Sequence, residues 1–159
     1  MTCALPPALL AAALAFALAF ASWRTIGLAL AVFAVTAVAV SLSPIGETSR
    51  ALIFVGLWAS IIVTAAAVHL ARPAPAWRSL VLAVNAGVWA GATLSVAGTP
   101  GDLPRAVPVA LLALPAAWLV GRGGGLAVKV VASWLIAVAI LAATLPMIAT
   151  PGFAPDHLG

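Results

Sequence analysis

The chain of 159 residues is 65% hydrophobic and only 6% charged, and its mean hydropathy is +1.27. A soluble domain carries roughly 25% charged residues, so this composition excludes a water-soluble globular protein and predicts an integral membrane protein. The formal net charge of +4 comes from seven Lys and Arg residues spread singly along the chain. Such cations are typical of the flanks of membrane spans and do not indicate a nucleic-acid-binding surface.

Six apolar runs follow one another along the sequence, and Gly, Pro, Ser and Arg separate them. A bilayer-spanning helix needs about 20 apolar residues. We therefore expect one all-α membrane domain over residues 1–159, a polytopic helix bundle of about six transmembrane helices. The expected helices are Ala4–Ala21, Ile26–Leu42, Ala51–Ala71, Leu80–Ala97, Ala106–Val120 and Leu126–Thr150.

The fifth of these runs differs from the others. It is the shortest, and Pro108 and Pro115 interrupt it. Proline removes a backbone donor and bends or ends a helix. We expect this segment to be kinked, tilted or partly re-entrant.

A repeated pattern suggests how the runs are paired. The pairs Trp23-Arg24 and Trp77-Arg78 lie 54 residues apart, and each is followed by an apolar run and then a link that contains Pro, Gly and an acid. A fainter third copy begins at Arg122 and ends at Pro151-Gly152. Repeats of this length indicate a repeated structural unit. The pattern predicts three tandem helical hairpins, at approximately 1–50, 51–105 and 106–159, with sequential neighbours packed antiparallel.

The charged residues predict an orientation. The loops after the odd-numbered helices hold cations and no acid, whereas the even-numbered loops and the tail hold all three acids. The positive-inside rule then places the odd loops in the cytoplasm and both termini outside, in a bacterial inner membrane. The residues concerned are Arg24, Arg72, Arg78, Arg122 and Lys129 on one side, and Glu47, Arg50, Asp102, Arg105 and Asp156 on the other.

Asn85 and Thr64 are the candidate polar pair inside the membrane. By helical rise, Asn85 lies ~10 Å beyond Arg78, and Thr64 lies ~12 Å before Arg72, so the two could meet across a hairpin. They could contact a solute or an ion, or they could form an interhelical hydrogen bond worth ~0.6–2 kcal/mol. We favour the hydrogen bond.

Three other features of the spans are interpreted as packing or as membrane anchoring. Ala83, Gly87 and Gly91 recur at every fourth residue, which allows another backbone to approach closely. Trp89 and Trp134 fall within spans and are expected to pack between helices. Trp23 and Trp77 fit an interfacial belt. Lys129 lies one turn into its helix and can extend its ammonium group back to the headgroups.

The sequence offers little for catalysis or for cofactor binding. The expected spans contain no Asp, Glu or Arg, whereas acid–base chemistry needs positioned titratable groups. His69 and His157 are expected on opposite faces, which excludes a shared haem or metal. Cys3, Met147, Asp156 and His157 could share the outer face as copper ligands, but their spacing is not that of a metal motif. We expect no catalytic residue, no metal and no cofactor, and therefore not an enzyme.

Two functions remain open at this point. One is a small non-catalytic inner-membrane protein, an accessory or assembly subunit of a larger membrane complex. The other is a small oligomeric transporter or channel for a small solute, because internal repeats are common in transporters. The nearly apolar midplane favours the accessory subunit. The expected partners are the lipid bilayer and either other membrane subunits or further copies of the chain.

Overall fold

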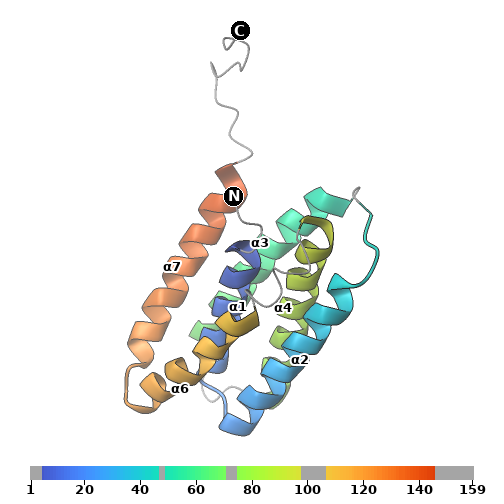
Figure 1. Cartoon of the computed structure of the whole chain (residues 1–159). Helices are drawn as coiled ribbons and strands as arrows, with labels where there is room; N and C mark the ends of the chain where they lie inside the picture. Colours follow the sequence, from blue (N-terminus) through green and yellow to red (C-terminus); the bar gives the residue numbers. More distant parts are fainter. Residues whose placement is uncertain (1–4, 47–48, 71–74, 98–106, 146–159) are drawn as a thin grey trace.

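The computed structural model describes residues 5–46, 49–70, 75–97 and 107–145. These residues form an all-α bundle of apolar helices (Figure 1). The elements are α1 (Leu5–Leu18), α2 (Trp23–Ser41), α3 (Arg50–Ala66), the 3-10 segment η2 (Ala67–His69), α4 (Ala76–Ala97), the 3-10 segment η4 (Val107–Leu112), α6 (Ala113–Gly121) and α7 (Gly125–Thr144).

Local sequence explains several helix ends. Helix α1 carries Pro6 and Pro7 in its first turn, where their missing amide hydrogens have no helical partner to lose. Ser22 caps α2, because its Oγ accepts a hydrogen bond from the Thr25 amide at 3.3 Å. The fifth apolar run is irregular, as Pro108 and Pro115 predicted, and consists of η4 followed by the nine-residue α6.

The helices alternate in direction along the chain (Figure 1). In that view α1, α3 and α6 run downward, whereas α2, α4 and α7 run upward. The turns that follow α1 and α6 therefore lie at the lower end of the bundle, together with the start of α4. We call this the lower end below.

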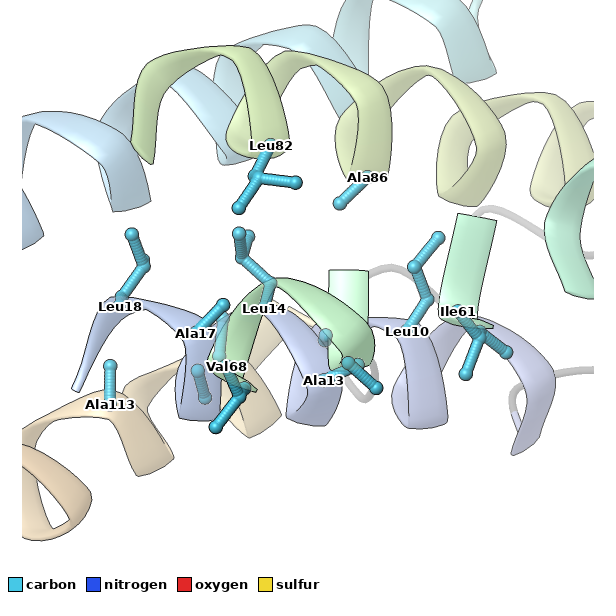
Figure 2. Packing of buried hydrophobic residues seen from close by; sticks show 14 of the residues in the cluster. Leu10, Ala13, Leu14, Ala17, Leu18, Ile61, Val68, Leu82, Ala86 and Ala113 are labelled. Carbon is cyan, nitrogen blue, oxygen red and sulfur yellow. The ribbon is translucent and has the colours of Figure 1, made fainter. Parts of the chain in front are cut away.

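The bundle is organised around α1. Every one of its 14 residues is apolar, and its buried residues point to all sides of the helix. It contacts α3, α4, η4, α6 and α7. Figure 2 shows Leu14 and Leu18 of α1 pointing toward Leu82 of α4, while Ala13 and Ala17 lie near Val68. A helix that is apolar all round is buried by its neighbours, and here five other elements surround it.

Helix α2 packs against α4 more extensively than any other pair of elements. The two helices are parallel, and residues 54 positions apart lie next to each other. A Cβ added to Gly87 would lie 2.9 Å from the Phe33 carbonyl oxygen, and one added to Gly91 would lie 2.6 Å from that of Ala37. The glycines thus allow the two backbones to touch, as the small-residue pattern predicted.

The predicted hairpin arrangement is not confirmed. The α3–α4 pair does pack as an antiparallel hairpin, and the Arg50 guanidinium donates to the Val96 carbonyl oxygen at 3.4 Å. Helix α1, however, makes no extensive contact with α2, and α7 packs mainly on α3 and only slightly on α6. A short turn brings two helices together only when their packing surfaces match, and the glycines of α4 match α2.

The helices have the character of membrane spans. Four of them are long enough and apolar enough to cross a membrane: Trp23–Ser41, Arg50–His69, Ala76–Val96 and Gly125–Thr144. Two apolar helices are shorter, Leu5–Leu18 and Pro108–Gly121. Large hydrophobic side chains also cover much of the exterior, among them Val35, Val63, Val84 and Leu141. We conclude that this is a membrane protein with several transmembrane helices.

Replacing Gly91 by Ala should destabilise the bundle. The new methyl group would press on the α2 backbone at Ala37, which cannot move aside as a side chain could, and overpacking of this kind costs about 1–3 kcal/mol. Gly27→Ala is the matched control, because a Cβ there meets nothing within 4 Å. Thermal unfolding in detergent measures both. If Gly91→Ala is as stable as Gly27→Ala, α2 and α4 do not pack in this way.

Candidate functional site

The polar contact inside the bundle joins Asn85 of α4 to Ser60 of α3. The Asn85 side-chain amide Nδ2 donates to Ser60 Oγ at 2.6 Å. Ser60 is buried, and Asn85 is half-buried. The bond crosses the antiparallel α3–α4 pair among apolar side chains, where a polar group without a partner would be costly. It therefore ties these two helices together in one register.

Thr64 does not take part in this contact. It follows Ser60 by one turn on α3 and is fully buried, and its Oγ1 has no hydrogen-bond partner in the structure. The predicted meeting with Asn85 assumed that α3 continues to Ala71 and that α4 begins at Leu80. Instead α3 ends at Ala66 and α4 begins at Ala76. The register therefore places Ser60, and not Thr64, opposite Asn85.

Among the described residues, the interior polar side-chain groups are hydroxyls, the Asn85 amide and the indole N–H of Trp58, which is buried without a hydrogen-bond partner. The buried polar side chains of the described residues are Ser60, Thr64 and Ser79. None of these titrates near neutral pH. Within the described ranges, no group of three His, Cys, Asp or Glu side chains could hold a metal ion. Several residues of the sequence predictions lie outside these ranges: Cys3, Glu47, Arg72, Asp102, Arg105, Met147, Asp156 and His157.

A second polar contact lies on the outside of the bundle and was not predicted. His69 at the end of η2 meets Ser133 of α7, with 3.3 Å between Nε2 and Oγ. Ser133 Oγ also donates to the carbonyl oxygen of Lys129 at 3.0 Å, and both His69 and Ser133 are exposed. The spacing of Lys129 and Ser133, one helical turn apart, could have indicated a polar face on α7. Nothing in the sequence showed that His69 would join it.

Tryptophan and arginine residues gather at the lower end of the bundle. Trp23 is the first residue of α2 and Trp77 the second of α4, and both are exposed. The Arg122 guanidinium lies over the Trp118 ring, 4.2 Å from its centroid. Exposed aromatic rings beside cations are typical of the membrane–water interface. The interfacial belt remains a prediction, and Trp118 lies at the same end of the bundle as Trp23 and Trp77.

The two mid-span tryptophans differ from each other. Trp89 packs on α3, because a Cβ at Gly56 would overlap its ring, and this confirms the packing prediction. Trp134 on α7 is 62% exposed, so the packing prediction is wrong for it within this bundle. The sequence places both residues near the middle of a helix but does not say which side of the helix faces a neighbour.

Among the described residues, an open apolar depression and an open, more polar one flank the short α6. One, of about 230 Å³, lies between α6 and α7 and is lined by Phe16, Pro115, Leu119 and Val131, among others. The second, of about 350 Å³, lies between the end of α1 and α6, beside Trp23. Neither is lined by Asn85, Ser60 or Thr64.

Comparison with known proteins adds no assignment. No protein-family model, curated protein or solved structure matches the chain.

A double-mutant cycle tests the structural role of the Asn85–Ser60 hydrogen bond. We expect Asn85→Ala and Ser60→Ala each to lower stability in detergent, and the coupling between them to be about 0.6–2 kcal/mol. Thr64→Val is the control, because its hydroxyl has no partner and its loss should cost little or nothing. A coupling near zero would contradict the helix-pairing role, and so would a large cost for Thr64→Val alone.

Proposed function

We propose that the protein is a non-catalytic accessory or assembly subunit of a larger membrane complex. The observation that carries this proposal is the position of α1, a helix without polar side chains that is buried in the middle of the bundle. A solute crossing the bundle would have to displace this helix. A function that depends on outward-facing surfaces requires no such displacement.

The polar side chains support the same proposal. Transporter sites usually lie near the midplane, between broken helices that offer backbone and polar groups. In this bundle Asn85 already uses its amide to bond Ser60. The exposed contact between His69 and Ser133 lies on the lateral surface instead. A small transporter would therefore require a pathway between several copies of the chain.

We further propose that the chain crosses the membrane six times, with the lower end in the cytoplasm of a bacterial cell and both termini outside. The alternating helix directions support six passes, and Arg24, Arg78 and Arg122 at the lower end support this orientation. At 14 residues, or ~21 Å, α1 is shorter than the ~30 Å bilayer core, but its neighbours shield it from lipid.

Six passes place Ser22 and Gly121 on the same side of the membrane. A cysteine at Gly121 should therefore be labelled from the same side as a cysteine at Ser22, and labelling from opposite sides would exclude a crossing by α6.

A related proposal concerns the repeat. The parallel α2–α4 pair brings together residues 54 positions apart, which is the spacing of Trp23-Arg24 and Trp77-Arg78 in the sequence. Tandem copies that pack side by side would produce this register.

The repeat predicts that the Trp-Arg pair and first helical turn of α2 can be exchanged with those of α4 and still give a folded bundle. Loss of the thermal unfolding transition in detergent would count against the repeat.

Purification of the tagged protein from its native membranes in a mild detergent tests the proposed function. We expect it to elute with at least one other membrane protein in constant proportion, well above the size of the detergent-bound 15.8 kDa monomer. The reason is that an accessory subunit binds its complex through surfaces that survive extraction. A homo-oligomer without a partner, with water reaching Asn85 and Thr64, would contradict the proposal and favour a transporter.

A further inference from the structure

One lateral surface of the bundle combines polar and aromatic side chains. We call it the α3–α7 face and define it by His69, Lys129, Ser133 and Trp134. Helices α3 and α7 pack together extensively, and the first three residues lie where the end of η2 meets α7. His69, Ser133 and Trp134 are exposed, and Lys129 is half-buried.

The polar part of this face lies well inside the span of α7. Ser133 follows Gly125, the first residue of α7, by eight residues, which is ~12 Å along the helix axis. The 3.3 Å contact holds the His69 imidazole at the same level. Ionisable groups at membrane depth normally face a bundle interior or a cavity, because exposure to lipid is costly. Here the imidazole is on the outside.

The hydrogen bonds of Ser133 define the chemistry of the face. Its single hydroxyl hydrogen is donated to the Lys129 carbonyl oxygen, so its oxygen accepts from His69, and Nε2 carries the hydrogen. The imidazole Nδ1 then carries a lone pair and can accept a hydrogen bond but not donate one. The Lys129 ammonium supplies up to three donors. None of the described residues is acidic, so this part of the chain offers no carboxylate to complement the ammonium.

Trp134 independently points to a covered surface. It is the tenth of the 20 residues of α7 and is 62% exposed. Exposed tryptophan in membrane proteins concentrates at the interfaces, not at mid-span. Large aromatic residues are also enriched among those that dominate binding energy at protein interfaces. A mid-span indole beside a polar contact is therefore better explained by a protein partner than by lipid.

We propose that the α3–α7 face binds a transmembrane helix of a different subunit, and that this helix carries an Asp or Glu side chain that accepts from the Lys129 ammonium. The inference rests on the proposed accessory function and names the partner chemistry of that function. A lipid headgroup reaches Lys129 but not Trp134, which lies nine residues, ~14 Å, beyond the start of α7, so a helix that covers both is the better match. A second copy of this chain offers no such helix among those described, because none of the described helices contains Asp or Glu.

Photo-cross-linking in native membranes tests the inference. A photo-reactive amino acid replaces Val130, which is 62% exposed and lies one turn before Trp134. The matched control replaces Val35, which is 69% exposed on α2. We expect position 130 to cross-link to a different membrane protein, at a transmembrane segment that contains Asp or Glu, and position 35 to give no such product.

Charge exchange then tests the pairing itself. With the probe at position 130, Lys129→Glu should lower the cross-link yield about tenfold, which corresponds to a loss of ~1.4 kcal/mol of binding free energy. Changing the partner's acid to Lys should restore the yield. Lys129→Gln removes the charge with little change in shape and should cause a smaller loss of cross-link yield. It replaces Lys129→Glu as the test variant if Lys129→Glu fails to fold. Unchanged thermal unfolding in detergent verifies that each variant is folded.

Each other outcome contradicts the inference in a recognisable way. A co-purifying partner that cross-links at position 35 but not at 130 would agree with the accessory function but exclude the α3–α7 face as the binding surface. Cross-linking of position 130 to lipid alone, or to a second copy of the chain, would exclude the proposed partner. Equal cross-linking in the wild-type and Lys129→Glu proteins would exclude the charge pairing. The absence of any partner at purification would overturn the accessory function together with the inference.

Discussion

The burial of an apolar helix is the constraint on which the rest of this structure depends. Helix α1 has no polar side chain, and from Leu10 to Leu18 all its residues are buried except Ala12 and Phe16, which are half-buried, so it stabilises the bundle only where other helices cover it. Its many alanines let α3, α4 and α6 approach it closely. Among the described residues, the centre is therefore filled by apolar side chains. The polar contact of His69 with Ser133 lies on the outer surface instead.

The remaining helices are held by two kinds of contact that suit a lipid environment. Glycines let α4 touch the backbone of α2, which maximises dispersion contacts where the hydrophobic effect contributes little. A single hydrogen bond from Asn85 to Ser60 sets the register of α3 against α4. The contact of His69 with Ser133 differs from both, because it lies on an exposed face of the bundle.

The sequence predicted the class of the fold better than its pairing. Composition was enough to predict apolar membrane helices, and Gly87 and Gly91 predicted a close helix contact. The partner helix could not be predicted, because spans that are apolar on every face give no periodic signal of the side that packs. This is also why Trp134 was expected inside. The predicted partner of Asn85 was wrong by one helical turn, Thr64 instead of Ser60. The reason is that the sequence does not locate the end of α3 and the start of α4, between residues 66 and 76, to within a turn.

Solvent access to the centre of α1 tests the central claim most directly. In a Cys3→Ala background, cysteine replaces Ala13, which is fully buried, and a charged, membrane-impermeant thiol reagent is applied to each side of sealed vesicles. Cysteines at the exposed Leu5 and Ser22 are the positive controls for the two sides. The account predicts labelling of Leu5→Cys and Ser22→Cys from opposite sides and no labelling of Ala13→Cys from either. Rapid labelling of Ala13→Cys in the folded protein would reveal water in the core and contradict the account.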